Sequence, residues 1–446
     1  MRKHLTNSAF GVLDYASYPL GMLLVAPIVL HKLGPSEYGL WMISTAVISA
    51  GGIIASGFSD ANIQRVAHLR GSGALHLIPS TVRSILGINL ALGLTLAAGA
   101  WMVAPYAAPH IAVAHQMSAS ECLTSLRIAS VSILFRSIET VAVSTQRAFE
   151  HYRATVQIST AVRLLTLASA AGLTLFGHRT TTILLATAFF LALGTCMQFR
   201  QLRRYFATIP LRPHFRSTET RTLLRMGGFV WLQELGAVVF GQFDRILLGV
   251  WLGALSVAPY SLCVQFAQPI YGLNASGLHF LFPYLSARSS TISSADLKRS
   301  ILKAFCCNLL LVAFGAAALL LLGNRLIKLW AGDAVAQIAA NILIPIVLST
   351  ALMGLSVTGT YAMQALGRFR DVALLSLASR ATMLLIMIEL IRHMGLQGLA
   401  ISRLCYGSAA LLVYFPLMRE LTAGKRESRR VPLIPAPCNV QEEANP

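Results

Sequence analysis

The sequence predicts an all-α integral membrane protein, and three observations carry that prediction. Of the 446 residues, 55% are hydrophobic and only 12% are charged, against about 25% charged in a typical soluble domain. The apolar residues gather in segments of about 20 residues, which is the length a helix needs to cross a bilayer. The basic residues collect in alternate connections between these segments. A water-soluble enzyme and a disordered chain are both excluded, because neither carries so much apolar sequence.

Twelve segments are long and apolar enough to cross the membrane, and each is expected to form one helix. The first contains Pro19 and Pro27, which allow a helix to bend. The fourth and the eighth carry the most polar groups. In chain order the expected helices cover residues 9–31, 38–60, 84–107, 122–146, 154–176, 180–199, 226–249, 257–283, 301–323, 338–365, 371–391 and 396–418.

The basic residues predict the topology. With the N-terminus in the cytoplasm, 25 of the 36 Lys and Arg residues fall in cytoplasmic segments, 5 fall on the other side and 6 lie within spans. This bias favours an even number of helices with both termini in the cytoplasm. It also accounts for the net charge of +19 without a nucleic-acid partner. The longest connection on the other side, about residues 105–121, has no Lys or Arg, so the activity is expected inside the helix bundle.

The two halves of the chain repeat one another. Three pairs of residues recur at separations of 219, 218 and 217 in corresponding helices: Leu33-Gly34 with Leu252-Gly253, Gln146 with Gln364, and Arg163 with Arg380. Because six helices are an even number, both halves cross the membrane in the same sense and form a parallel repeat, an arrangement typical of transporters. The expected domains are an N-terminal six-helix lobe (1–200), an Arg-rich cytoplasmic linker (201–225), a C-terminal six-helix lobe (226–419) and a cytoplasmic tail (420–446).

Charged residues within the spans are the candidates for function, because inserting each costs about 2.5–3.5 kcal/mol. The six basic residues there are all arginine, whose planar guanidinium binds phosphate oxygens through two hydrogen bonds. We therefore expect an anionic, phosphorylated substrate. The residues expected to bind it are Arg163, Arg380, Arg403 and Arg136.

The acidic residues within the spans have other expected roles. Asp14 stands alone in the first span, and it and Glu139 are the candidates for coupling to a proton or an ion. Glu139 follows Arg136 by three residues, so the alternative is that the two side chains simply neutralise each other. For the neighbours Asp244 and Arg245, a structural role or a place at the rim is favoured.

No enzyme, cofactor or metal site is indicated. The sequence has no phosphate-binding P-loop and no GxSxG nucleophile elbow. His110 and His115 share a small polar loop without flanking carboxylates, so no metal site is expected there.

Two motifs resemble those of a known family. The segment LGPSEYGLW, from Leu33 to Trp41, and YAMQALGRFRD, from Tyr361 to Asp371, resemble patterns of polysaccharide biosynthesis flippases. These are the Wzx-type O-antigen transporters of the multidrug/oligosaccharidyl-lipid/polysaccharide exporter superfamily. The resemblance implies a MATE-like pair of lobes that alternates access, with a cationic cavity for the sugar-diphosphate head.

The same resemblance implies a substrate, a location and partners. The substrate is an undecaprenyl-diphosphate-linked oligosaccharide, flipped from the cytoplasmic to the periplasmic leaflet of the bacterial inner membrane. Membrane lipids and polysaccharide polymerase machinery are the further partners, and nucleic acid is not one. The lipid II flippases of the superfamily usually carry two more C-terminal helices, whereas this chain ends in a polar, Pro-rich tail.

Two other functions stay open. A cation-coupled multidrug exporter of the same fold predicts an acidic cavity in which Asp14 and Glu139 dominate. A membrane glycosyltransferase, such as an O-antigen polymerase or ligase, typically needs a large periplasmic loop, and no loop of that length is expected here.

Overall fold

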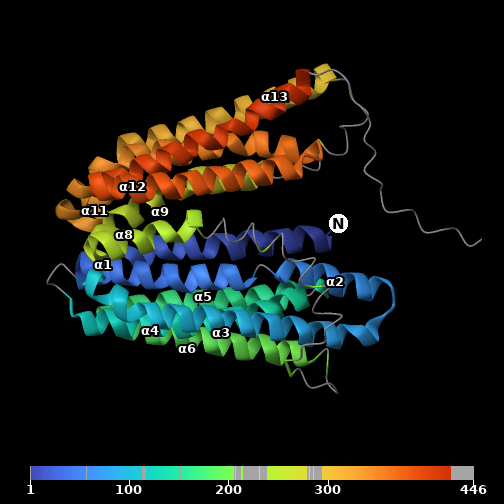
Figure 1. Cartoon of the computed structure of the whole chain (residues 1–446), viewed down its shortest axis with the longest axis horizontal. Coiled ribbons are helices and arrows are strands. Elements are labelled where there is room, and N and C mark those ends of the chain that lie inside the picture. Colours follow the sequence, from blue (N-terminus) through green and yellow to red (C-terminus); the bar gives the residue numbers. More distant parts are fainter. Residues whose placement is uncertain are drawn as a thin grey trace, which may run out of the picture.

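In the computed structural model the helices form two lobes that lie one above the other (Figure 1). The described part of the chain contains helices and no strand, as the composition predicts. It comprises residues 2–56, 58–112, 117–149, 152–204, 206, 212–213, 223, 231, 239–278, 281, 285 and 294–422, and the side chains of residues 2–20 are outside it.

The first lobe holds α1 to α6 and the second holds α8 to α13. In the first lobe the elements are α1 (Arg2–Ser56), α2 (Ser59–Gly71), η1 (Leu75–Leu77), α3 (Ile78–Ile111), α4 (Ala119–Ala148), α5 (Tyr152–Leu175) and α6 (Thr180–Arg203). In the second they are η2 (Val239–Phe243, a π-helical turn), α8 (Asp244–Leu252), α9 (Ala254–Gly277), α11 (Ser294–Ala365), α12 (Phe369–Ala410), η3 (Leu411–Val413) and α13 (Tyr414–Thr422).

Several connections that the sequence predicts as loops are single glycine residues. The predicted first and second spans meet at Gly34 within α1, where φ is 84°, and Gly332 and Gly395 interrupt α11 and α12 in the same way. Only glycine adopts positive φ there without strain. The two halves of α11 lie side by side. A hydrogen bond of 2.9 Å shows this, since it runs from the Asn308 side-chain amide, before Gly332, to the carbonyl of Gly354, after it. The expected loop at 324–337 is therefore wrong, since helix continues on both sides of Gly332.

Helix boundaries also differ at the longest expected loop. α3 continues through Pro105 and Pro109 to Ile111, which shortens the connection predicted at 105–121. Six helical stretches of the described chain are long and apolar enough to cross a membrane, and the two longest contain 70 and 52 residues, enough for more than one crossing each. Half of the predicted seventh span lies outside the described residues, so the number twelve stays a prediction. The expected linker, 201–225, lies largely outside them too.

The internal repeat is visible in backbone and side-chain geometry. Gly34 has φ 84° and ψ 171°, and Gly253, 219 residues later, terminates α8 with φ 79° and ψ 166°. The Asn89 amide donates to the Thr140 hydroxyl at 3.1 Å, joining α3 to α4. The same bond recurs in the second lobe at 3.0 Å, from Asn308 to Thr358, which stand 219 and 218 residues further along.

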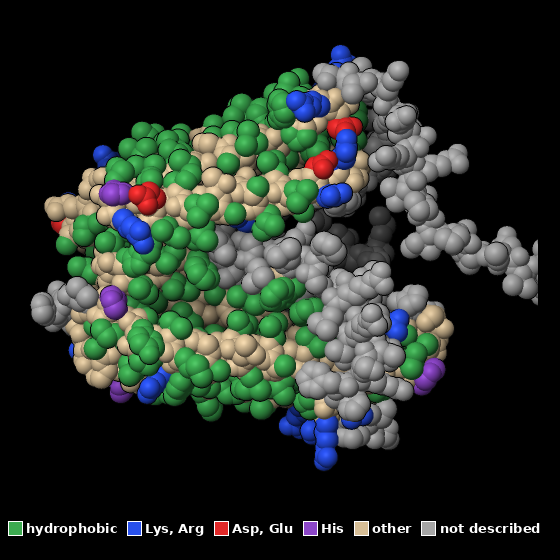
Figure 2. All heavy atoms as spheres, in the orientation of Figure 1, with side chains coloured by type: hydrophobic (Ala, Val, Ile, Leu, Met, Phe, Trp, Pro, Cys, Tyr) green, Lys and Arg blue, Asp and Glu red, His purple; other side chains and the backbone are tan. Residues whose placement is uncertain are grey.

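The two ends of the bundle differ. We call the end that carries Gly34, Gly253 and Gly395 the glycine end, and the opposite end, where the N-terminus, α2 and α13 lie, the basic end (Figure 1). Figure 2 shows basic side chains gathered on both lobes at the basic end. The exposed ones among the described residues include Arg200, Arg203, Arg204, Lys298, Arg299, Arg370 and Arg419.

The apolar cores explain how the lobes are joined. One large cluster of buried side chains extends through both lobes, from Met22 in α1 to Tyr406 in α12. Two smaller clusters lie apart from it. The first surrounds Ile85 and Leu202 and also includes Leu223 and Trp231, which follow α6, and the second surrounds Ile301 and Leu417. The lobes thus share a core toward the glycine end and keep separate cores at the basic end, where the two layers diverge (Figure 1).

Candidate functional site

The LGPSEYGLW motif forms the joint between the lobes at the glycine end. The buried hydroxyl of Tyr38 accepts a hydrogen bond from the Gln265 side-chain amide of α9 at 3.2 Å. Gly39 lies directly against the backbone of Ala254, because a Cβ atom at position 39 would stand 1.8 Å from the Ala254 carbonyl oxygen. Glycine at position 39 lets α1 and α9 approach closely, as small residues do in membrane bundles.

Replacing Gly39 with alanine is therefore expected to destabilise the joint. The added methyl group has no room against the Ala254 backbone, and overpacking of this kind costs about 1–3 kcal/mol. The measurement is the melting temperature of the purified protein in detergent. Gly99→Ala is the matched control, because nothing lies within 4 Å of a Cβ at that helical position. Equal melting temperatures of the two variants would contradict the close contact.

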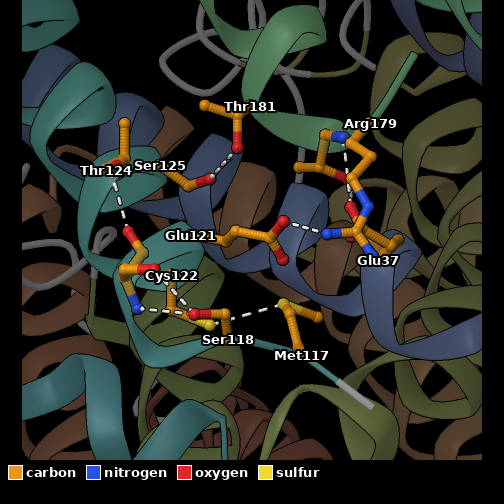
Figure 3. Close-up of polar contacts among 11 residues, drawn as sticks. Glu37, Met117, Ser118, Glu121, Cys122, Thr124, Ser125, Arg179 and Thr181 are labelled. Atoms are coloured by element: carbon orange, nitrogen blue, oxygen red, sulfur yellow. Dashed lines mark hydrogen bonds and ion pairs between the residues drawn. The ribbon is translucent and has the colours of Figure 1, made fainter.

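The same motif also ties the joint to the rest of the first lobe. The Glu37 carboxylate accepts from the backbone N–H of Thr180 at 3.0 Å, and the Thr180 hydroxyl donates to the Glu37 carbonyl at 3.0 Å. A carboxylate at this position is favoured by the positive end of the α6 dipole. Arg179 lies between two acidic side chains, 3.7 Å from Glu37 and paired with Glu121 of α4 (Figure 3). Glu37 thus joins α1 to α6, a contact between residues 143 positions apart that the sequence pattern did not reveal.

Arg163 and Arg380 lie on comparable faces of their helices. Arg163 is half-buried in α5, and at 100° per residue it stands opposite the row of exposed side chains at 157, 161, 164, 165 and 168. It shares a face with Leu167, whose side chain packs where Gly21 of α1 leaves space. Both the arginine and the α1 contact are therefore on the side turned away from lipid.

The second-lobe arginine has the same orientation. Arg380 is half-buried in α12, opposite the exposed row at 374, 377, 378, 381, 382, 385 and 389. Its Nε is buried and makes no hydrogen bond within the described part of the chain, as is also the case for Arg127 and Arg245. A buried guanidinium nitrogen without a hydrogen-bond partner is costly, and an anionic ligand is one way to satisfy it.

Arg136 and Glu139 form the ion pair that their spacing allows. The Arg136 guanidinium is 3.0 Å from the Glu139 carboxylate, and the two side chains are 38% and 5% exposed. Arg136 also lies next to Gly52 of α1, where a Cβ would be 3.4 Å from the Arg136 Cβ. Of this pair the arginine is the accessible member, while the carboxylate expected to couple transport to an ion is buried beside its own counter-charge.

Arg403 lies in a buried cluster with two residues of neighbouring helices. Its guanidinium contacts the Asp244 carboxylate of α8 and donates to the Tyr260 hydroxyl of α9 at 2.6 Å. The Tyr260 hydroxyl in turn donates to Asp244. Arg403 is 7% exposed, Asp244 1% and Tyr260 0%, so the cluster is closed to solvent in this conformation. We call these three residues the α8–α9–α12 cluster.

This cluster belongs to the second lobe alone. Shifted by the repeat separations of 217–219, its members correspond to residues 25–27, 41–43 and 184–186, all of which are apolar. The fold of one lobe therefore forms without such a cluster. The sequence favoured a structural or rim role for Asp244 but did not identify Arg403 as its partner. The sequence did contain a signal, because both residues lie at a similar distance from the glycine end. Asp244 precedes Gly253 by nine residues, and Arg403 follows Gly395 by eight.

The remaining candidate falls outside the described side chains. Asp14 belongs to the first part of α1, and its side chain lies among those not described. Within the described residues no group of three or more His, Cys, Asp or Glu side chains is arranged to hold a metal ion.

A family model described as "Polysaccharide biosynthesis protein" matches residues 9–288. No curated protein matches the sequence. Among solved structures, the fold is similar to an inward-facing multidrug resistance MATE family transporter of the MOP superfamily, with a TM-score of 0.70 and 13% identity over 93% of this chain and 99% of the other. It is also similar to the lipid II flippase MurJ in an inward closed conformation, with a TM-score of 0.72 and 14% identity over 92% and 87%.

A third similar structure is a MOP superfamily transporter from Pyrococcus furiosus, described as having a binding pocket of reversed polarity, with a TM-score of 0.57 and 14% identity over 94% and 96%. At these identities the likeness concerns the fold. The MATE-like architecture predicted from the sequence is thereby confirmed.

Proposed function

The chain belongs to the family of polysaccharide biosynthesis proteins, and from that premise we propose that it flips undecaprenyl-diphosphate-linked oligosaccharide across the bacterial inner membrane. The cargo is an O-antigen, capsule or exopolysaccharide repeat unit, and it moves from the cytoplasmic to the periplasmic leaflet by alternating access. The fold of the protein is related to those of the MATE transporters and the lipid II flippase.

The observation that carries the proposal is the placement of two repeat-related arginines. Arg163 and Arg380 are half-buried, and each stands on the helix face opposite the exposed row. Two guanidinium groups turned from lipid, one in each lobe, suit a ligand with two adjacent phosphates because each binds phosphate oxygens in a fork. A lipophilic cation would be repelled by the same pair.

The shape of the bundle fits the route of such a substrate. The lobes are joined at the glycine end and diverge at the basic end, which the positive-inside rule assigns to the cytoplasm (Figure 1). The diphosphate and sugars enter between the lobes while the polyprenyl tail stays in the bilayer. The polar head then avoids the cost of crossing hydrocarbon without hydrogen bonds.

Arg136 and Arg403 can contact the diphosphate only after their present ion pairs break. Arg136 is 38% exposed and reaches a diphosphate by leaving Glu139. Arg403 contributes only in a conformation in which Asp244 and Tyr260 no longer hold it.

A deletion strain tests the proposal. We expect loss of surface polysaccharide together with accumulation of lipid-linked repeat units on the cytoplasmic side. The measurements are a surface glycan stain and an assay of undecaprenyl-linked intermediates in the same cells, with a plasmid copy of the gene as the control.

Unchanged surface glycan with raised sensitivity to cationic dyes would overturn the proposal. The protein would then be a cation-coupled multidrug exporter of the same fold, with coupling assigned to Asp14 and Glu139.

A further inference from the structure

A groove runs between the start of α12 and the α13 region on the second lobe, near the basic end. Its volume is about 510 Å³, within the range of small-molecule sites. Its lining is almost wholly apolar, and three of the lining side chains are more than half exposed: Leu374 at 55%, Leu412 at 55% and Phe415 at 60%. The lining residues are Asp371, Leu374, Leu375, Leu412, Phe415 and Pro416.

The last helix is interrupted beside the groove. α12 passes into the 3₁₀ turn η3 at Leu411 before α13 begins at Tyr414. On the opposite face of this segment Val413 and Leu417 are buried in the core of the second lobe. The exposed apolar face of the same segment is therefore turned outward, toward the acyl chains.

The groove has a cationic rim on its basic-end side. The Arg419 guanidinium lies over the Phe415 ring, 4.2 Å from its centre, so a cation stands directly on the groove lining. Arg370 is exposed at the start of α12, beside the other wall. Leu374 follows Arg370 by four residues and Phe415 precedes Arg419 by four, which separates rim from lining by about 6 Å along each helix.

The two acidic residues of the rim share one counter-charge. The Asp371 carboxylate is 3.4 Å from the Arg368 guanidinium, and Arg368 also pairs with Glu420. This group of three carries a net charge of −1, and Arg370 and Arg419 bring the net charge of the rim to +1. The cationic rim and the apolar lining together suit an amphiphile with a negatively charged headgroup.

We propose that this groove binds one anionic glycerophospholipid of the leaflet at the basic end, with an acyl chain along Leu374, Leu412 and Phe415 and the phosphate on Arg419. Basic residues at a membrane surface attract anionic headgroups, and an apolar cleft one turn deeper lies at the depth of the acyl chains. The site is on the outer face of the second lobe and does not depend on the proposed substrate.

The test uses the full chain purified in detergent. Phosphatidylglycerol that carries a photoreactive group on one acyl chain is titrated in, and the cross-linked peptide is identified by mass spectrometry. We expect saturable labelling within residues 411–418. Unlabelled phosphatidylglycerol should compete, and phosphatidylcholine should compete at least fivefold more weakly.

Two variants and one control identify the contacts. Arg419→Gln is expected to weaken phosphatidylglycerol binding about fivefold, the effect of one basic residue at an anionic surface. Phe415→Ala removes both the ring beneath Arg419 and part of the lining, and it should reduce labelling of this segment. Arg299→Gln is the control, because Arg299 is exposed at the same end on α11 and does not line the groove. Melting temperatures without lipid verify that all three variants are folded.

Three results would overturn the inference. Equal losses in Arg299→Gln and Arg419→Gln would indicate diffuse attraction to the basic end instead of a site. Equal competition by phosphatidylcholine would indicate an apolar crevice without headgroup selection. Competition by undecaprenyl phosphate but not by phosphatidylglycerol would assign the groove to the polyprenyl tail of a substrate.

Discussion

Cells in which Arg163 or Arg380 is replaced by alanine are expected to lack surface polysaccharide while the variant protein remains in the membrane at the wild-type amount. Each guanidinium is proposed to hold the diphosphate of the lipid-linked oligosaccharide, and a hydrogen bond to a charged group is worth about 1.5–3 kcal/mol. Loss of one contact should therefore lower flipping by about tenfold or more, since about 1.4 kcal/mol is a factor of ten. Glycan staining and immunoblots of the membrane fraction measure the two quantities.

Two other arginines serve as matched controls. The Arg127 guanidinium lies 4.8 Å from the centre of the Trp101 ring in the first lobe, and the Arg392 guanidinium lies 5.8 Å from the centre of the Trp251 ring in the second. Their alanine variants remove the same charge from the same lobes and should retain glycan. Wild-type glycan in both Arg163→Ala and Arg380→Ala would remove the role proposed for this pair.

Replacing Arg403 with alanine is expected to destabilise the second lobe strongly. Asp244 would keep a buried charge without its counter-ion, and removing one member of a buried ion pair costs about 3–5 kcal/mol. The measurement is the melting temperature of purified protein in detergent, with Arg325→Ala as the control because Arg325 is exposed on α11.

A double variant distinguishes a structural from a substrate-binding role for Arg403. In Asp244→Asn with Arg403→Met both charges are gone, and stability should recover toward the wild-type value because no buried charge remains uncompensated. Recovery of both stability and surface glycan would make the α8–α9–α12 cluster purely structural. Recovery of stability without glycan would support the contact between Arg403 and the diphosphate that the sequence predicts. A single Arg403→Ala variant as stable as the wild type would contradict the ion pair itself.

The sequence reasoning succeeded where a property is carried by composition or local spacing. The apolar segments predicted α4, α5 and α6 to within a few residues, because a membrane helix must be apolar over its whole length. The Leu33-Gly34 and Leu252-Gly253 pair predicted the repeat, since a positive-φ glycine is needed at each of these helix junctions. The same reasoning placed loops at 324–337, where the polar residues Asn324, Arg325, Lys328 and Asp333 are tolerated in helix near the end of the bundle.

By itself the sequence determined that this is an all-α membrane protein with arginines within its spans, because hydropathy and charge bias are properties of the chain alone, and the MATE-like architecture followed from the resemblance of two motifs to polysaccharide flippases. Only the tertiary structure decided what those residues contact. Arg403 meets Asp244 across 159 positions, and Glu37 meets Thr180 across 143. Which side chains meet at such separations depends on how the helices rotate and pack against one another. Close contacts such as that of Gly39 with the Ala254 carbonyl set this packing.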